Sequence, residues 1–441
     1  MTIIKTNLHE SQLKRTLTPI MLWGLGVGYV ISGMYFGWNL GLEKGGTLGL
    51  AISTLFIILM YVTFTFSYAE LACAIPKAGG GFDYANRALG KDWAFIVGMA
   101  QNIEFIFAPP AIAFAIGAYF NLFFPQIPII AIAIFSYVVF TFLNIRGVKA
   151  AAMFELIITM LAVGELLLFA GVTIPHFELK NLQANPLPNG IPGILASLPF
   201  AIWFFLGIEG VANVAEEAIK PQKTILIGFG SAILTLVVLC ILTFSSSIGV
   251  AGWEAIVYKS DGTASDSPLP LALARIVGDN NILYHLLITF GLFGLVASFH
   301  GIILAAGRST YEFGKIKFAP PVLGKINQKF QTPANALIFN MAIGIFALFT
   351  GKTAEIITIS VFGALTLYAI SMVSVIKLRI SEPELHRPFK VPFYPLFPII
   401  ALVIAVGAFI AMTFFNQMLA AIYISIIMTC FIAFKIHEKR K

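Results

Sequence analysis

Charged residues are scarce in this sequence: Asp, Glu, Lys and Arg make up 11% of its 441 residues, whereas hydrophobic residues make up 59%. A soluble domain of this length needs more charge than that to cover its surface. The mean hydropathy is +0.90, and apolar runs of about 20 residues recur along the chain, each long enough to cross a hydrocarbon core of about 30 Å. The composition therefore excludes a soluble protein and predicts an all-α integral membrane protein.

Cysteine is also rare, and catalytic motifs are missing. Cys73, Cys240 and Cys430 lie inside or at the ends of the apolar runs, without the spacing of a metal or redox site. The six histidines are dispersed, with no HExxH motif and no recognisable Ser–His–Asp arrangement. We therefore expect no catalytic residue, no metal site and no cofactor, and we predict that the protein is not an enzyme.

Twelve apolar runs are candidates for membrane-spanning helices. A polar tail of residues 1–17 precedes them and a second tail, 436–441, follows; no signal peptide is apparent, because the first run continues directly into a spanning helix. The predicted spans lie near residues 18–41, 47–74, 92–120, 127–144, 149–173, 192–215, 223–249, 282–307, 333–350, 354–378, 395–415 and 419–435.

The basic residues fall mainly on one side of this topology. With the N-terminus placed in the cytoplasm, all but five of the 28 Lys and Arg lie on the cytoplasmic side. The five exceptions are Lys44, Lys180, Lys259, Arg275 and Lys352. This asymmetry predicts a multi-pass protein of the inner (plasma) membrane with both termini in the cytoplasm. The net charge of +7 therefore orients the chain in the bilayer and does not indicate a nucleic-acid partner.

Glycines interrupt two of the predicted spans. They recur through Trp23–Trp38 in the first span and through Pro199–Asn213 in the sixth. Glycine costs a helix interior roughly 1 kcal/mol relative to alanine, and an interrupted helix in lipid must have its backbone groups satisfied by protein, water or a ligand. Corresponding interruptions five spans apart are typical of an inverted-repeat transporter with its binding site near the middle of the membrane.

Several carboxylic acids lie inside predicted spans. Glu104 and Asn102 are near the middle of the third span, Glu165 is near the middle of the fifth, and Glu209 lies within the interruption of the sixth. Such residues normally face the bundle interior or a cavity. Glu104 either carries protons or forms a neutral hydrogen bond between helices, and Glu165 either transfers protons or pairs with a neighbouring donor. We interpret His300 as structural and Glu70 as an interfacial residue before a connecting loop.

Five motifs, taken in order, resemble the amino acid–polyamine–organocation superfamily over essentially the whole chain. They are Gly28-x-x-x-Ser32-Gly33-x-x-Phe36, the Ala69–Gly81 loop, Leu143–Lys149, Trp203–Gly210 with Glu216-Glu217-x-x-Lys220-Pro221, and Arg387–Pro392. The resemblance implies a LeuT-like fold with a five-plus-five inverted repeat in residues 18–378, discontinuous helices 1 and 6, and two peripheral helices in 395–435.

Within that superfamily, Val27–Asn39 is most similar to the ethanolamine permeases, with Met34 at a position that is often acidic in that branch. Ile103-Glu104-Phe105 resembles the Leu-Glu-Tyr of cationic amino acid transporters, in which the glutamate is implicated in coupling. The resemblance therefore implies a permease for a small amine and makes Glu104 a candidate coupling residue.

We predict a secondary active transporter that imports a small amine, ethanolamine as the first candidate, coupled to or exchanged with protons; the alternative is an amino acid permease. A channel or a nutrient receptor would share this topology. Symport versus exchange and the oligomeric state stay open. The expected substrate-binding residues are Ile31, Ser32, Gly33, Met34, Asn102, Phe105, Trp203, Phe204, Leu206, Gly207 and Glu209, and the candidate proton carriers are Glu104, Glu165 and Glu209.

In this scheme Glu209 and Glu104 face the ammonium group of the substrate. Trp203 and Phe204 cap the ammonium by cation–π contact, which is worth about 0.5–2 kcal/mol. The Ser32–Gly33 backbone or Asn102 meets the substrate hydroxyl. In an amino acid permease, the same backbone N–H groups would hold the carboxylate.

Overall fold

The computed structural model describes residues 16–77, 79–146 and 151–439. The predictions for most of the N-terminal tail, for Ala78, for the 147–149 part of the Leu143–Lys149 motif and for residues 440–441 lie outside the described residues, as does the side chain of Glu216. Within the described ranges every regular element is a helix, and the β-type pairings there are isolated bridges. The prediction of an all-α protein is confirmed.

The helices are joined by mostly short connections. In chain order they are α1 (Pro19–Val30), α2 (Ser32–Tyr35), α3 (Leu40–Ala74), α4 (Gly81–Leu89), α5 (Lys91–Asn121), α6 (Ile129–Arg146), α7 (Ala151–Thr173), η1 (Ile174–His176), α8 (Leu179–Gln183), α9 (Gly190–Ala196), α10 (Leu198–Trp203), η2 (Ile208–Glu217), α11 (Pro221–Ala251), α12 (Glu254–Val257), α13 (Pro268–Val277), α14 (Ile282–Lys315), α15 (Ala334–Leu348), α16 (Thr353–Ser381), α17 (Leu396–Phe415) and α18 (Gln417–Lys439).

Ten stretches in the described part of the chain are long and apolar enough to cross a membrane. They coincide with the second to eighth and the tenth to twelfth predicted spans. The first and ninth predicted spans fall on the pair α1 and α2 and on α15, which are shorter. The structure thus supports a multi-pass membrane protein, and the count of twelve spans stays a prediction.

The first predicted span, 18–41, ends too late. α2 ends at Tyr35, and α3 already begins at Leu40. A kink at Gly46, where φ is 63° and ψ is −171°, joins the short first part of α3 to its long second part. Glycine adopts this left-handed φ at little cost, so the chain changes direction here before the long second helix.

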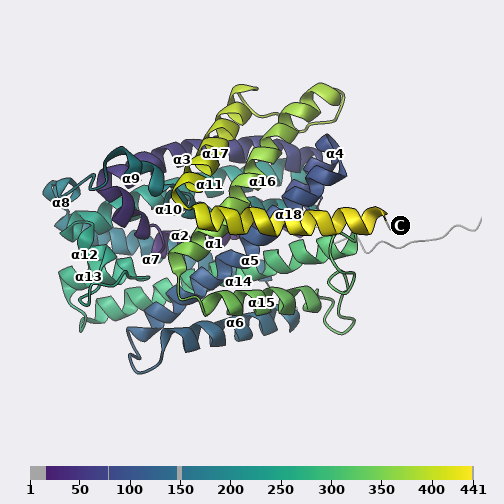
Figure 1. Cartoon of the computed structure of the whole chain (residues 1–441). Helices are drawn as coiled ribbons and strands as arrows, with labels where there is room; N and C mark the ends of the chain where they lie inside the picture. The colour runs from purple at the N-terminus through teal and green to yellow at the C-terminus, as the bar shows by residue number, and fades with distance from the viewer. Residues whose placement is uncertain (1–15, 78, 147–150, 440–441) are drawn as a thin grey trace, which may run out of the picture.

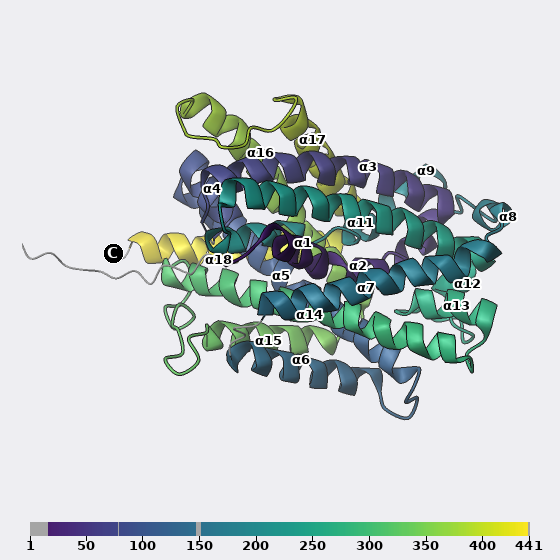
Figure 2. The same cartoon turned by 180° about the vertical axis from the view of Figure 1, so that it is seen from behind.

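The long helices run roughly along one axis, and α1 and α2 lie among them (Figure 1), as the view from behind also shows (Figure 2). α1 packs against α7, α11 and α14, whereas α5 packs against α14 and α16. The most apolar window of α5 is 89% buried and that of α18 is 17% buried. α5 is therefore a central helix, and α18 lies on the outside of the bundle.

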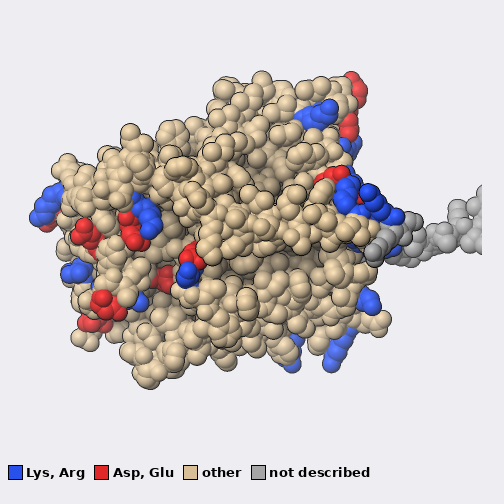
Figure 3. All heavy atoms as spheres, in the orientation of Figure 1, with Lys and Arg blue, Asp and Glu red and all other residues tan. Residues whose placement is uncertain are grey.

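Charged side chains gather at the two ends of this axis. On the face drawn in Figure 3, the end that carries the C-terminus shows more Lys and Arg than Asp and Glu, and the opposite end mixes both signs. The surface between the ends is nearly free of charge. An uncharged belt between charged ends suits a bundle embedded in lipid, because charge at that depth is costly.

α16 approaches α5 closely beside Glu104. A Cβ atom on Gly363 of α16 would lie 2.4 Å from the carbonyl oxygen of Ala100 and 2.9 Å from the backbone nitrogen of Glu104. One turn earlier on α16, the Ser360 hydroxyl donates a hydrogen bond of 2.7 Å to the Glu104 carbonyl. The position of Glu104 is thus set by close backbone contact between two central helices.

Replacing Gly363→Ala should push α16 away from α5, because the new Cβ meets backbone atoms that cannot rotate aside. We expect a loss of about 1–3 kcal/mol of stability, as for other overpacked sites, measured as a lower unfolding temperature in detergent. Gly407→Ala in α17 is the control, since a Cβ there meets nothing within 4 Å and alanine favours a helix. Equal effects of the two substitutions would contradict the close packing at Gly363.

Candidate substrate site between the interrupted helices

The first interruption separates α1 from α2 and then ends α2. Ile31 lies between the two helices but keeps helical angles, with φ of −60° and ψ of −23°. The chain becomes extended only at Phe36 and takes a left-handed φ of 86° at Gly37. The departure at Ile31 is therefore slight, and the larger departure from the helix lies at Phe36–Gly37, where glycine permits the turn.

A hydroxyl group from α14 is inserted into the helix at the first interruption. In a regular α-helix the Ser32 N–H would donate to the Gly28 carbonyl. Here the Ser298 hydroxyl donates to the Gly28 carbonyl at 2.6 Å and accepts from the Ser32 N–H at 2.9 Å. The Ser32 N–H, which the sequence analysis assigned to the substrate, therefore donates to a protein side chain in this conformation.

Aromatic donors satisfy carbonyl groups at the same interruption. The Trp38 indole donates to the Met34 carbonyl at 3.0 Å, and the Trp203 indole donates to the Phe36 carbonyl at 3.1 Å. Trp203, which lies at the second interruption, thus satisfies a backbone carbonyl of the first interruption. Phe204 stacks on Trp38, with ring centroids 5.5 Å apart.

The second interruption follows α10 and meets the first directly. Helix α10 ends at Trp203, Gly207 takes a left-handed φ of 96°, and the chain continues as the 3₁₀-helix η2. A Cβ atom on Gly33 would lie 2.5 Å from the Trp203 carbonyl oxygen and 3.1 Å from the Phe204 Cα. The two glycine-rich segments that the sequence paired are therefore in backbone contact.

Two carboxyl groups meet beside this contact. Glu209 on η2 accepts a hydrogen bond of 2.8 Å from the Tyr368 hydroxyl, and the Glu104 carboxyl of α5 is close enough to interact with it electrostatically. Both Glu104 oxygens and Glu209 Oε1 are buried without a hydrogen-bond partner among the described residues. Both residues are buried: Glu104 is 0% exposed and Glu209 is 1% exposed. Two buried carboxyl groups that interact disfavour each other's charge, so a proton on one of them would stabilise the pair.

Most of the predicted substrate-binding residues lie on the two interrupted segments and are buried. Phe105 on α5 joins them, since its ring lies 3.8 Å from where a Cβ on Gly210 would stand. The buried members of this group are Ile31, Ser32, Gly33, Met34, Phe105, Trp203, Phe204, Leu206, Gly207 and Glu209.

Asn102 does not belong to this group. Its amide donates to the Gly98 carbonyl and accepts from the Thr310 hydroxyl at 2.7 Å, and it lines a cavity between α5, α14, α15 and α18. Residues two apart on a helix do not face the same way, so Asn102 and Glu104 point to different sides of α5. Its assignment to the hydroxyl of the substrate stays a prediction, and here its amide is partnered by Gly98 and Thr310.

Glu165 has different neighbours from the other two acids. It lines a small cavity with Tyr119 and residues of α13 and α14, and its carboxyl lies within hydrogen-bonding reach of the Tyr35 hydroxyl. The Tyr119 hydroxyl in turn donates to the Tyr35 carbonyl at 3.1 Å. The Tyr35 hydroxyl donates to the Ala162 carbonyl at 3.0 Å, and Glu165 Oε2 has no hydrogen-bond partner among the described residues. Proton transfer and pairing with a donor therefore both stay open for Glu165.

The sequence interpretation missed a buried acid–base pair. The Glu155 Oε2 of α7 lies 3.5 Å from the His300 Nδ1 of α14, with side-chain exposures of 2% and 5%. The other Glu155 oxygen lies 2.6 Å from where a Cβ on Gly28 would stand. His300 was interpreted as structural from the sequence, but no sequence pattern joins it to a position on a different helix.

Glu70 is an anchor near the C-terminal end of α3. Its carboxylate accepts two hydrogen bonds of 2.7 Å from Arg379 and one of 2.7 Å from the Val391 N–H, and Arg387 lies 3.3 Å away. Glu70 is only 2% exposed, because these partners surround it, and its interpretation as an interfacial residue stays a prediction. Two of the motifs that carried the family resemblance thus meet at one carboxylate.

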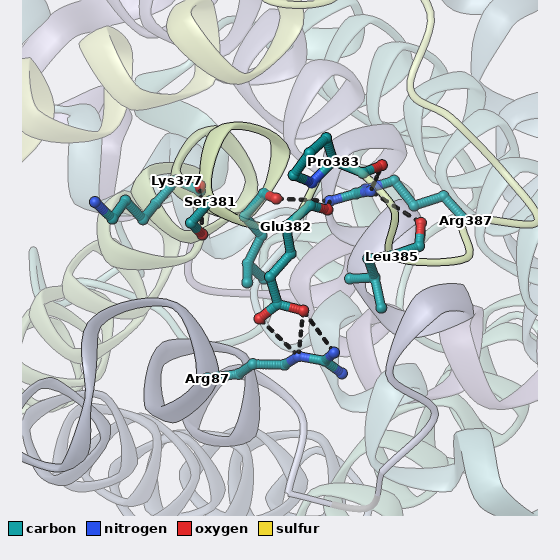
Figure 4. Close-up of polar contacts among 8 residues, drawn as sticks. Arg87, Lys377, Ser381, Glu382, Pro383, Leu385 and Arg387 are labelled. Atoms are coloured by element: carbon teal, nitrogen blue, oxygen red, sulfur yellow. Dashed lines mark hydrogen bonds and ion pairs between the residues drawn. The ribbon is translucent and has the colours of Figure 1, made fainter.

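Arg387 also closes the end of α16. Its guanidinium donates to the carbonyls of Leu378, Glu382, Pro383 and Leu385, and the Glu382 carboxylate pairs with Arg87 of α4 (Figure 4). The Glu382–Arg87 pair is partly exposed and contributes little by itself. Together these contacts hold the loop after α16 against α3 and α4.

At the opposite end of the bundle, the loop before α13 closes over the first interruption. The Asn39 side chain accepts from the Gly37 N–H at 3.1 Å and donates to the Ser265 carbonyl at 2.7 Å. The next residue, Asp266, accepts from the Thr353 hydroxyl at 3.1 Å. Burial raises the pKa of Asp266 to about 6, and the Thr353 hydrogen bond and Lys259 oppose the shift only in part.

Two interrupted helices in backbone contact, with buried carboxyl groups beside them, are typical of membrane transporters. The amino acid permease family model matches residues 17–436. The chain belongs to the amino acid permease family.

Relatives along almost the whole chain are transporters. A methylthioribose transporter of Bacillus subtilis is 28% identical over 89% of this chain and 87% of its own. A branched-chain amino acid permease of the same organism is 26% identical over 91% and 88%, and an uncharacterised transporter of Rhizobium meliloti is 28% identical over 91% and 87%. The expectations of a permease and of a multi-pass membrane protein are thereby supported, whereas the substrate differs among the named relatives.

The contact between Glu155 and His300 should appear as an energetic coupling. We expect Glu155→Gln and His300→Gln each to lower the unfolding temperature, because each leaves a buried polar partner without its counterpart. The double variant should lose less than the sum of the two single losses. Strictly additive losses would show that the two side chains do not interact.

Asp266 should make stability depend on pH. An unfolded Asp titrates near pH 3.9, so the raised pKa means that the folded protein binds this proton more tightly. The stabilisation is complete below about pH 4 and is lost as the pH rises through about 6. We expect Asp266→Asn to gain in unfolding temperature over the unsubstituted protein between pH 5 and pH 7.5. Parallel pH profiles of the two proteins would contradict this.

Proposed function

We propose that this permease is a secondary active transporter of a small organic amine, with ethanolamine as the first candidate, and that protons are its coupling ion. The observation that supports an amine is the buried pair of Glu104 and Glu209 at the contact of the two interrupted helices. An ammonium group is the natural partner of a carboxylate that is otherwise buried in an apolar bundle.

The surroundings of the pair favour a cation. Within the described part of the chain, no Lys, Arg or His forms an ion pair with Glu104 or Glu209. Trp38 and Phe204 offer stacked ring faces near the interruption, and such faces attract an ammonium group with about 0.5–2 kcal/mol. The arrangement therefore suits a positive charge better than a negative one.

The occupied Ser32 N–H favours a substrate without a carboxylate. It is hydrogen-bonded to Ser298 at 2.9 Å, so a carboxylate could reach it only after the Ser298 hydroxyl moves away. Ethanolamine carries an ammonium and a hydroxyl group but no carboxylate, so its binding does not require the Ser298 hydroxyl to move away. Its hydroxyl could instead exchange hydrogen bonds with Ser298, which already donates and accepts at this point.

An amino acid is the alternative substrate. Membership in the amino acid permease family and the name of the branched-chain amino acid permease support it. In that case the Ser32 N–H would exchange Ser298 for the carboxylate of the amino acid, and the Glu104–Glu209 pair would hold its ammonium group.

A proton on this carboxyl pair offers a basis for coupling. A carboxyl pair that holds one proton presents a different charge after the proton leaves, so occupancy by a proton and by an ammonium group depend on each other. Glu165, next to Tyr35, is a second candidate on a proton path. We propose that the protein lies in the inner membrane. Both termini and the excess of basic residues then lie on the cytoplasmic side.

Uptake of labelled ethanolamine into proteoliposomes tests the proposal. With an imposed pH gradient we expect saturable accumulation, competed by unlabelled ethanolamine and not by alanine, serine, leucine or arginine. An imposed sodium gradient alone should drive none. Uptake of amino acids without uptake of ethanolamine would contradict the amine and support the alternative. Flux that is unaffected by collapse of the pH gradient would contradict proton coupling.

Two variants test the carboxyl pair. Glu209→Gln and Glu104→Gln should each lower uptake by about tenfold or more, since a hydrogen bond to a charged group is worth roughly 1.5–3 kcal/mol. Glu178→Gln is the matched control, because Glu178 is exposed before α8 and should transport normally. Undiminished uptake by Glu209→Gln would remove this residue from the site.

A further inference from the structure

A second cavity lies on the side of α5 that faces away from the carboxyl pair. It has a volume of about 840 Å³ and is lined by α5, α14, α15, α18 and the loop after α14. We call it the α5–α18 groove. Its walls include Met99, Ile106, Phe313, Ile343, Cys430 and Phe434.

The groove is as deep as one leaflet of a bilayer. On α5 its lining runs from Phe95 to Phe107, and on α18 from Ile426 to His437. Twelve residues of helix rise about 18 Å, whereas half of a hydrocarbon core of about 30 Å is about 15 Å. Both stretches extend inward from the end of the bundle that carries the C-terminus, where basic residues are in excess.

Apolar walls and a basic rim characterise the groove. Among its lining residues none is Asp or Glu, and the basic ones are Lys317 and His437. Both are exposed, and within the described part of the chain neither has a carboxylate at ion-pair distance. Lys91 stands nearby over the Phe434 ring, 5.2 Å from its centroid, and pairs with Glu438.

Two polar side chains stand on the wall below the rim. The Thr310 hydroxyl and the Asn102 amide oxygen, which share a hydrogen bond of 2.7 Å, both line the groove. Asn102 follows Phe95 by seven residues on α5, which places it about 10 Å further from the rim along the helix. The wall thus offers polar groups between the charged rim and the apolar floor, as the ester groups of a lipid would need.

We propose that the α5–α18 groove binds one anionic phospholipid from the leaflet at the basic end, with an acyl chain between α5 and α18 and the phosphate group at Lys317 and His437. A spanning helix of another protein fits less well, since it needs about 20 residues to cross the membrane and the groove covers only one leaflet. The basic rim distinguishes an anionic lipid from a zwitterionic one.

Thermal unfolding of the full-length, delipidated protein in detergent tests the proposal. Phosphatidylglycerol should raise the unfolding temperature at concentrations at which phosphatidylcholine with the same chains does not, and native mass spectrometry should count one tightly bound phosphatidylglycerol. Equal shifts with the two lipids would overturn the anionic preference. A shift with inorganic phosphate alone would show an anion site in place of a lipid site.

Three variants locate the site. Lys317→Ala should weaken phosphatidylglycerol binding about fivefold, as expected for one Lys facing an anionic headgroup, whereas Lys329→Ala, an exposed lysine of the same loop that does not line the groove, should not. Ala433→Trp fills the groove from α18 and should abolish binding. Ala433 is exposed, so the lipid-free unfolding temperature of this variant should stay unchanged. Retained binding by Ala433→Trp would overturn the proposal.

Discussion

The candidate site depends on the contact between Gly33 of α2 and the Trp203 carbonyl at the end of α10. A Cβ atom on Gly33 would stand 2.5 Å from that oxygen, so a residue without a side chain lets the two interrupted segments meet. Their contact brings the Trp203 indole to the Phe36 carbonyl. It also leads the chain through the left-handed Gly207 to Glu209, where the carboxyl group meets Glu104 of α5.

Backbone groups released by an interruption in lipid must find partners, and here side chains of other helices provide them. Ser298 of α14 joins the Gly28 carbonyl to the Ser32 N–H, and Trp203 caps the Phe36 carbonyl. Each of these hydrogen bonds crosses between elements far apart in the chain. A substrate that replaced one of them would therefore loosen the contact of α1 or α2 with its neighbours, which gives binding a direct route to helix movement.

Helix α5 is the wall shared by the two proposed sites. Glu104 faces α16 and η2, whereas Asn102 and Ile103 line the α5–α18 groove. The close contact with Gly363 holds the side that bears Glu104, while the groove leaves part of the other side without a protein neighbour. A lipid in the groove would complete the packing of α5, so the position of Glu104 rests on both faces of one helix.

The sequence by itself determined what depends on local composition: ten of the spans from hydropathy, the two interruptions from their glycines, and the family from motifs in order. It also named Glu104 and Glu209 as buried acids. Only the tertiary structure decided that these two meet, that Glu165 has Tyr35 as its neighbour, and that Asn102 faces the groove. The same holds for the pair of Glu155 and His300. Hydropathy records whether a residue enters the bilayer, whereas these pairings depend on helix rotation and on contacts between residues about a hundred or more positions apart.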